Sequence, residues 1–306
     1  MIAVPAVFIT LGVGVPLAPL VFVFAFVVDA AARMPNLPTV RFVSLAYQLL
    51  ALEVAAIVAA LGLWVSRRGI AAHSRVQSWW AGQVVRAAWR SLHVRFEVTG
   101  EETIQPGPVI VLCRHASYVD ALLPALIFGT RSGFQLRYVI AQELTWLPSL
   151  NLFGHRLPNV FVERGTRADG QAERVGRLAT GLTGDIAVVI FPEGQFPTAA
   201  RRDRVLASVE RSDPERFARV SALRHVLPPR PAGTIALMEA APDVDIVVMA
   251  HRGLERLDNL RSLWREVPLA APVEVQLSRV ASPTTERERW LDDQWASIDA
   301  WLDQHR

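Results

Sequence analysis

Two long apolar runs open the chain. Residues 2–28 carry no charged side chain, and residues 42–65 are nearly as apolar. A helix rises 1.5 Å per residue, so the first run reaches about 40 Å, which exceeds the roughly 30 Å hydrocarbon thickness of a bilayer. The connection, 29–41, has the proline and asparagine content of a turn. The pattern predicts an N-terminal hydrophobic helical hairpin, residues 1–66, that anchors the chain in a membrane.

Prolines in the first run and an ionisable residue in the second affect how this hairpin can lie in a membrane. Pro5, Pro16 and Pro19 lie within the first run and predict a kink or break near its middle. Glu53 lies within the second run, where an ionisable group at mid-bilayer costs several kcal/mol. Glu53 therefore faces the other helix, or the hairpin is re-entrant and stays in one leaflet. A cleaved signal peptide is disfavoured because no basic residue precedes the first run and no clear small-residue cleavage site follows it.

The segment 67–92 is basic. The chain between Glu53 and Glu97 has no acidic residue but six arginines, so the positive-inside rule places this side of the hairpin in the cytoplasm. Each arginine near anionic lipid contributes about 1 kcal/mol of attraction. The segment also contains Trp79, Trp80 and Trp89, which is typical of an interfacial helix. An ordinary amphipathic helix with its tryptophans packed on a globular domain is the alternative.

The rest of the chain, 93–306, alternates short apolar runs with helical patterns. This alternation predicts an α/β domain with a mixed, mostly parallel sheet flanked by helices. Residues 199–226 are polar and arginine-rich, which predicts exposed helix. The predicted buried strands are Val109–Cys113, Tyr138–Ala141, Asn159–Val162, Ile186–Phe191 and Ile246–Ala250, and the predicted helices include Gly170–Leu182, Gly233–Glu239 and an amphipathic C-terminal helix, Thr284–Gln304, that docks on the domain or the membrane.

Composition narrows the function. Half of the residues are hydrophobic, which excludes a disordered chain. The 32 basic residues, all arginine, nearly balance 29 acidic ones, which argues against a nucleic-acid binder. The lone cysteine, Cys113, excludes a disulfide framework and a multi-cysteine metal site. The sequence also has no Cys/His ligand cluster for a metal.

Chemistry is predicted where the strand 109–113 runs into the sequence R-H-A-S-Y-V-D, because ligands collect at the carboxyl ends of such strands. His115 and Asp120 are five residues apart and would lie about 140° apart on one regular helix. They can meet if His115 lies in the turn after the strand and Asp120 in the first helical turn. The carboxylate would then fix the imidazole tautomer and leave a base for a substrate hydroxyl.

Plainer interpretations of this segment remain. Ser117-x-x-Asp120 is also a capping-box pattern, so Asp120 could simply complete a helix start. Ser117 as an acyl nucleophile is weaker, because no Gly-x-Ser-x-Gly elbow surrounds it.

Three segments further along the chain supply candidate site residues in addition to His115 and Asp120. The strand at 159–162 leads to Arg164, whose guanidinium suits a phosphate. The sequence I-F-P-E-G ends another strand with Glu193 and Gly194, and glycine permits close backbone approach or a positive φ. The sequence H-V-L-P-P-R-P-A-G, which contains Arg230, then precedes an apolar helix.

Together these segments resemble the four motifs of the membrane-bound glycerolipid acyltransferases, which include the lysophosphatidic acid acyltransferases. The first motif is a histidine and an aspartate separated by four residues, and the second is an apolar strand that ends in arginine, here F-V-E-R. The third is F-P-E-G, and the fourth contains a proline, here in P-R-x-x-G. They occur in the family's order between residue 93 and about residue 250, after a hydrophobic anchor.

The resemblance implies an O-acyltransferase that esterifies the free hydroxyl of a lysophospholipid, most of all 1-acylglycerol-3-phosphate to phosphatidic acid. The donor is acyl-CoA or acyl-carrier protein, no cofactor is needed, and the catalytic domain faces the cytoplasm. The partners are then the acyl donor, the lysophospholipid and the bilayer. In the roles that the resemblance implies, the general base is His115, its orienting group is Asp120, and the acceptor's head group is held by Arg164, Glu193, Gly194 and Arg230.

The chain departs from the family pattern in two places. Gln195 follows Gly194, so the arginine usual in the third motif, which is associated with the acceptor's phosphate, is absent. Arg201 or Arg202 could substitute for it. Arg114 stands where asparagine is common in the first motif. The alternatives are therefore an acyltransferase for another lipid hydroxyl (lysophospholipid remodelling, glycolipid or aminolipid), a membrane-bound thioesterase, and a catalytically silent membrane-associated binding protein.

Overall fold

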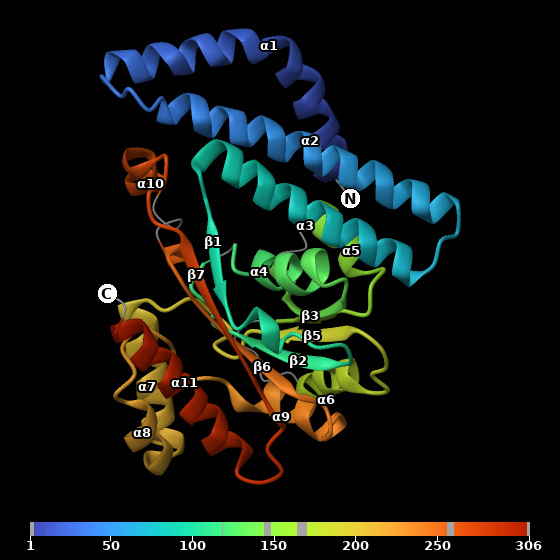
Figure 1. Ribbon diagram of the computed structural model, residues 1–306, viewed down its shortest axis with the longest axis vertical. Helices are drawn as coiled ribbons and strands as arrows, with labels where there is room; N and C mark the ends of the chain where they lie inside the picture. The colour runs from blue at the N-terminus through green and yellow to red at the C-terminus, as the bar shows by residue number, and fades with distance from the viewer. Residues whose placement is uncertain (1–2, 118, 144–147, 164–169, 256–259, 305–306) are drawn as a thin grey trace.

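The computed structural model (Figure 1) describes residues 3–117, 119–143, 148–163, 170–255 and 260–304. Helices cover both faces of one central sheet. In Figure 1 the helices α1, α2 and α3 stack above the sheet, and α6, α9 and α11 lie below it. The predicted fold class, a mixed sheet flanked by helices and preceded by a hydrophobic hairpin, is confirmed.

Seven strands form the sheet in the order β1-β7-β6-β2-β5-β3-β4. The five strands from β6 to β4 run parallel, whereas β7 is antiparallel to β6 and β1 is parallel to β7. The bounds are β1 (Phe96–Thr99), β2 (Val109–Cys113), β3 (Gln135–Ala141), β4 (Val160–Val162), β5 (Ile186–Ile190), β6 (Ile246–Arg252) and β7 (Val273–Val280).

The five parallel strands are those that the sequence predicted, but β1 and β7 were missed. Both lie at one edge of the sheet, and their residues alternate between more and less buried positions. A strand with one open face carries polar residues at every second position, so it lacks the continuous apolar run of a strand buried on both faces. The predicted strands were found by such runs.

The helices that the structure describes fall into groups along the chain. The N-terminal group packs above the sheet, and later helices follow individual strands. Their bounds are α1 (Ala3–Ala31), α2 (Pro38–Val65), α3 (Ile70–Leu92), α4 (Leu122–Pro124) with a π-helical turn (Ala125–Arg131), α5 (Pro148–Gly154), α6 (Gln171–Gly176) with a 3-10 turn (Arg177–Ala179), α7 (Ala199–Ser212), α8 (Pro214–Val220), α9 (Pro231–Ala240), α10 (Leu260–Glu266) and α11 (Arg287–Gln304), besides a 3-10 turn (Glu101–Thr103) after β1.

The sheet separates two apolar cores. Side chains of β2 alternate between them: Val109 and Val111 face the core under α3, whereas Ile110 and Leu112 face the core shared with α9 and α11. All five residues of β2 are buried. The central strand is therefore held from both sides, and its carboxyl end is a rigid base for the residues that follow it.

The C-terminal helix docks on the domain, which decides between the two surfaces that the sequence left open. Its apolar residues, Leu291, Trp295, Ile298 and Leu302, are all buried in the lower core. The predicted helical region 199–226 is divided into α7 and α8, because Asp213 and Pro214 end one helix and begin the next.

The first two helices form the predicted hairpin. Both α1 and α2 are long and apolar enough to cross a membrane. The ribbon of α1 bends sharply in Figure 1, although its helical assignment continues through Pro16 and Pro19. The buried carboxylate of Asp29 accepts the backbone N–H groups of Thr39 and Val40, each at 3.0 Å. Asp29 thus caps the start of α2, a role that the apolar pattern gave no means of predicting.

Glu53 contacts the α/β domain. Its carboxylate accepts the backbone N–H of Ser149, in the first turn of α5, at 2.7 Å. Gln48 donates to the hydroxyl of Ser91 in α3 at 2.9 Å. These polar residues of α2 therefore connect the helix to the α/β domain rather than to α1, and a re-entrant hairpin stays a prediction.

The basic helix α3 lies between α2 and the sheet. Gly82 of α3 and Gly129 of the π-helical turn allow the two segments to approach closely, since an added Cβ would lie 2.9 Å from Thr130 or 2.7 Å from Ser78. Trp79 and Trp89 are exposed. Trp80 is half-buried against the domain core, as the alternative of an amphipathic helix packed on the domain expects, whereas the interfacial location of α3 stays a prediction.

Candidate active site

The first predicted pair meets at the carboxyl end of β2. His115 Nδ1 lies 3.2 Å from Asp120 Oδ2, and the Asp120 side chain is fully buried, whereas that of His115 is 12% exposed. Because an ionised carboxylate only accepts, His115 carries its proton on Nδ1 and has a free lone pair on Nε2. The ring lies between Phe191 and Phe196, with centroid distances of 4.8 and 4.4 Å.

Asp120 also organises the backbone of its own turn. Oδ2 accepts the backbone N–H groups of Ala116 and Ser117, and Oδ1 accepts the Ser117 hydroxyl at 2.6 Å. Asp120 lies in the turn before α4 rather than in the first helical turn. Ser117 donates in both of its contacts with the Asp120 side chain, and α4 begins after Ala121 without a side-chain cap, so the capping-box interpretation is not confirmed.

The electrostatics keep Asp120 ionised. Burial alone would raise the pKa of Asp120, but the positive field of His251 and the hydrogen bonds from His115 and Ser117 outweigh it and leave this pKa below its ordinary value. An ionised aspartate stabilises the imidazolium that forms when His115 accepts a proton. The arrangement is that of a base and its orienting group.

A second histidine lies on the other side of Asp120. His251, at the end of β6, is fully buried, and its Nε2 lies 3.1 Å from the carbonyl oxygen of Arg114 and 3.6 Å from Asp120 Oδ2. Burial and the charge of Arg114 lower the pKa of His251 against the pull of Asp120. Since a carbonyl only accepts, Nε2 carries the proton. The sequence analysis missed His251, which lies 131 positions beyond Asp120 and in no motif.

Arg114 contacts both His251 and Glu255. Its guanidinium donates to the carbonyl oxygen of His251 and to the carboxylate of Glu255, and its side chain is 3% exposed. The residue that replaces the family's usual asparagine thus faces inward, toward β6.

Glu193 lies behind the site, where it faces backbone amides. One carboxylate oxygen accepts the N–H of His115 at 2.8 Å and the other accepts the N–H of Leu227 at 2.9 Å. Glu193 is only 1% exposed. Burial raises its pKa to about 7, in spite of those amides and the charge of Arg114. Because both oxygens are occupied inside the protein, the geometry favours a bracing role for Glu193 over the predicted contact with a head group.

Gly194 and Arg230 come together at the wall of the site. Gly194 has a φ of +69°, a left-handed conformation that favours glycine, and a Cβ added there would lie 3.4 Å from Arg230 Nε. The backbone N–H of Arg230 donates to the carbonyl oxygen of Pro192 at 2.8 Å. The third and fourth motifs are therefore joined directly, and both residues line the same pocket as His115.

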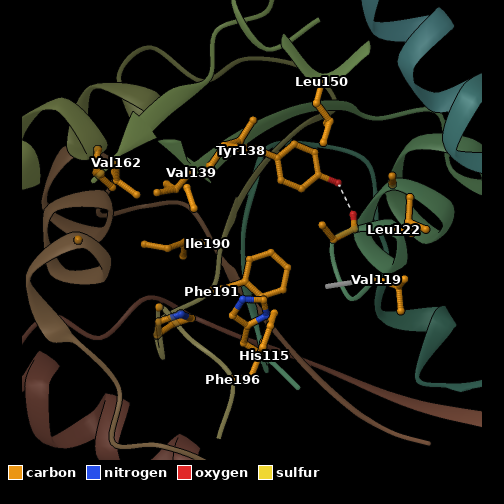
Figure 2. Close-up of a pocket in the computed structure, with 18 of the residues that line it drawn as sticks. His115, Val119, Leu122, Tyr138, Val139, Leu150, Val162, Ile190, Phe191 and Phe196 are labelled. Atoms are coloured by element: carbon orange, nitrogen blue, oxygen red, sulfur yellow. Dashed lines mark hydrogen bonds between the residues drawn. The ribbon is translucent and has the colours of Figure 1, made fainter. Parts of the chain in front are cut away.

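The pocket beside His115 has a volume of about 630 Å³ and a mainly apolar lining (Figure 2). The Tyr138 hydroxyl donates to the carbonyl oxygen of Ala121 at 3.1 Å, so this phenol presents its ring to the pocket. Helices α3 and α5 supply part of the lining. Apolar side chains that the close-up shows around the space are Leu122, Val139, Leu150, Val162 and Ile190. An acyl chain suits such a lining.

The remaining predicted cations lie elsewhere. Arg164 is outside the described residues. Arg201 donates to the carbonyl oxygen of Phe196 at 3.2 Å and Arg202 to that of Ser221 at 3.4 Å. Neither Arg201 nor Arg202 lines the pocket, whereas Arg230 does. Within the described part of the chain, no cluster of three His, Cys, Asp or Glu side chains could hold a metal ion.

Comparisons with known proteins identify the class. The model of the acyltransferase family matches residues 95–252, which are more than half of the chain, so the chain belongs to the acyltransferase family. This confirms the resemblance that the motifs indicated and makes the protein an enzyme of that class. Among solved structures, the chain is similar to PlsC, the 1-acyl-sn-glycerophosphate (LPA) acyltransferase from Thermotoga maritima, with 15% identity, a TM-score of 0.49, and coverage of 76% of this chain and 81% of that one. A search of curated proteins gives no match.

Proposed function

We propose that this acyltransferase transfers an acyl chain from a thioester donor, acyl-CoA or acyl-carrier protein, to the free hydroxyl of a lysophospholipid. The acceptor that fits best is 1-acylglycerol-3-phosphate, which yields phosphatidic acid. The observation that carries the proposal is the His115–Asp120 contact at the wall of an apolar pocket. This combination supplies a base next to a space for a lipid chain.

In the proposed reaction, His115 Nε2 accepts the proton of the acceptor hydroxyl while that oxygen attacks the thioester carbonyl. The tetrahedral intermediate collapses, the C–S bond breaks, and the imidazolium returns the proton to the leaving thiolate. The ester bond formed replaces the thioester bond lost, so no oxidant or reductant is needed. Asp120 holds the ring and balances its transient positive charge.

Arg230 is our candidate for the acceptor's phosphate. It lines the pocket together with His115, on the wall formed by the third and fourth motifs. A guanidinium can bind a phosphate through two parallel hydrogen bonds. In this proposal Arg230 supplies the positive charge that the family's third motif usually carries and that Gln195 does not.

We further propose that the hairpin lies in a membrane with the α/β domain on its cytoplasmic face. The support is the apolar length of α1 and α2 and the arginines that follow them. Both substrates carry long chains that are costly to expose to water. Because α2 packs on α3 and α3 lines part of the pocket, the hairpin lies close to one wall of the pocket.

The test is acyl transfer by the purified full chain in detergent micelles, with labelled acyl-CoA and a panel of acceptors. We expect His115→Ala to lower kcat/KM by about 10²- to 10⁴-fold for every acceptor, because the base is lost. Thermal unfolding checks that the variant is folded. Undiminished transfer by a folded His115→Ala variant would eliminate the proposed base, and thioester loss that needs no acceptor would favour the thioesterase.

A second substitution tests the head group. We expect Arg230→Gln to raise KM about tenfold for 1-acylglycerol-3-phosphate and to leave KM for 1-monoacylglycerol unchanged, since one charge-assisted contact of about 1.5 kcal/mol is lost only with the phosphate. Arg211→Gln, at an exposed arginine of α7, is the matched control. An equal loss with both acceptors would remove the assignment of Arg230 to the phosphate.

A further inference from the structure

A second hollow, of about 460 Å³, lies where α2 ends, and it shares no lining residue with the pocket beside His115. Its walls come from the last turn of α2, from the residues after it, and from the segment after α5. The lining residues are Leu63, Trp64, Val65, Arg67, Arg68 and Arg156. Three guanidinium groups and an indole thus surround one space.

The end of α2 presents two of these arginines together. The backbone N–H of Arg68 donates to the carbonyl oxygen of Leu63 at 2.9 Å, and that of Arg67 donates to Trp64 at 3.1 Å. This pair of hydrogen bonds ends helices through a left-handed residue, a position where glycine is favoured. Arg67 holds the position with a φ of +51°.

The third arginine comes from a distant part of the sequence. Arg156 follows α5, and the carbon of its guanidinium lies 5.5 Å from the centroid of the Trp64 ring. This cation–π contact brings Arg156 to the arginines at the end of α2. The hollow is therefore assembled by the tertiary fold rather than by one basic stretch of chain.

Among the residues that the structure describes, no carboxylate neutralises the charges of the hollow. No acidic residue occurs between Glu53 and Glu97. In the part of the chain that the structure describes, none of the three arginines has a carboxylate within ion-pair distance. Adjacent unneutralised guanidinium groups favour a ligand with negative charge.

The apolar side chains around the hollow favour a ligand that has apolar parts as well as negative charge. Trp64 is 57% exposed and Val65 is 75% exposed, and both belong to the last turn of a helix long and apolar enough to cross a membrane. Tryptophan followed by arginine at such a helix end is typical of the boundary between hydrocarbon and head groups. A free phosphate would use the charges but not these exposed apolar side chains.

We propose that this hollow, the α2-end basic pocket, binds the phosphate of an anionic phospholipid, with Trp64 and Val65 against its glycerol and upper acyl chains. The proposal rests on the membrane location proposed above, but it does not involve the catalytic pair. Three arginines disfavour the choline of a zwitterionic lipid, so the expected ligand carries net negative charge.

The test uses the purified full chain in non-ionic detergent, titrated with phosphatidylglycerol brominated on its acyl chains. Bromine quenches nearby tryptophan fluorescence, and the difference between wild type and Trp64→Phe isolates the signal of Trp64. We expect saturable quenching with phosphatidylglycerol, little with brominated phosphatidylcholine, and no competition by inorganic phosphate. Equal quenching by both lipids would overturn the requirement for net charge, and full competition by phosphate would assign the pocket to free phosphate instead.

Two matched variants separate a pocket from a general basic surface. Arg67→Gln/Arg68→Gln/Arg156→Gln removes three charges from the pocket, and Arg75→Gln/Arg86→Gln/Arg90→Gln removes three exposed charges from α3. We expect the first variant to weaken phosphatidylglycerol binding by at least about tenfold and the second by less than about threefold. Equal losses would overturn a discrete pocket.

Measurements of acyl transfer test lipid binding by the α2-end basic pocket separately from the proposed reaction. Acyl transfer measured in micelles without anionic lipid should persist in the pocket variant, since its three arginines lie outside the catalytic pocket. His115→Ala should lose acyl transfer and keep phosphatidylglycerol binding. Loss of both properties in the folded pocket variant would contradict the separation of the two sites.

Discussion

Two buried carboxylates, at the ends of neighbouring parallel strands, behave in opposite ways. Asp120 follows β2 and Glu193 follows β5, each is 1% exposed, and each accepts two backbone N–H groups. Asp120 also faces His115 and His251, and its pKa lies below the ordinary value, whereas burial raises the pKa of Glu193 to about 7. Burial is thus similar for the two, and their neighbours differ. His251, His115 and Ser117 outweigh the effect of burial on Asp120, whereas the backbone amides and the charge of Arg114 do not outweigh it for Glu193.

The largest expected effect concerns the ionised carboxylate. Asp120→Asn keeps the size of the side chain but removes the charge that holds the Nδ1 proton and balances the imidazolium. We expect kcat to fall by about 10²-fold with little change in KM. Kinetics of acyl transfer measure this, with Asp203→Asn, an exposed aspartate of α7, as the control. A folded Asp120→Asn variant with wild-type kcat would make Asp120 a purely structural residue.

The next effect concerns Glu193 and the pH dependence of the free energy of unfolding. The folded pKa of Glu193, about 7, exceeds the ordinary 4.5, so the folded state binds more protons between these values. The free energy of unfolding should therefore decrease as pH rises from about 4.5 to about 7, by up to about 3 kcal/mol. Asp120 has the opposite sign, because its lowered pKa gives stability above pH 3.8 that is lost as pH falls further.

Thermal unfolding of wild type and Glu193→Gln across this pH range checks that prediction. At pH 5 the wild-type carboxyl is protonated and, like glutamine, has one full acceptor oxygen, so the variant should differ from wild type in stability by no more than about 1 kcal/mol. Its stability should also lose the decrease between pH 4.5 and 7. A variant that keeps the full pH slope would show that other groups cause it.

The smallest expected effect concerns His251. His251→Phe removes the N–H that faces the Arg114 carbonyl oxygen and Asp120, with Glu255 the remaining charged neighbour. We expect a decrease in kcat of about fivefold with unchanged KM, because Asp120 and the Arg114 carbonyl oxygen lose the N–H that faces them. His251→Gln, which restores an N–H, should recover part of kcat. A loss of stability with wild-type kcat would limit His251 to packing.

The sequence was informative where chemistry and hydrophobic pattern are local. The strand β2 is a continuous apolar run, and His115 and Asp120 lie five residues apart beside it, so their meeting could be predicted from the geometry of a turn. The apolar hairpin was equally clear. The division of the chain at residues 66 and 92 stays a prediction, as do the roles assigned to the site residues.

What the sequence did not show depends on contacts between distant segments. His251 reaches Asp120 only because β6 pairs with β2. Phe196 packs on His115 because the turn after β5 folds back over the end of β2. Glu193 was expected to face a head group, but the orientation of its side chain is set by the amides of His115 and Leu227, which no local pattern brings together.

The contact between Glu53 and Ser149 has a practical consequence for anyone who would shorten this enzyme. Leu150, the neighbour of Ser149 in α5, forms part of the wall of the pocket beside His115. Deletion of the first 66 residues to obtain a water-soluble fragment would therefore strip a helix-start partner from α5 and uncover the outer side of α3. The hairpin therefore supports the wall of the pocket. Kinetics will reflect the native pocket when they are measured on the full-length protein solubilised in detergent.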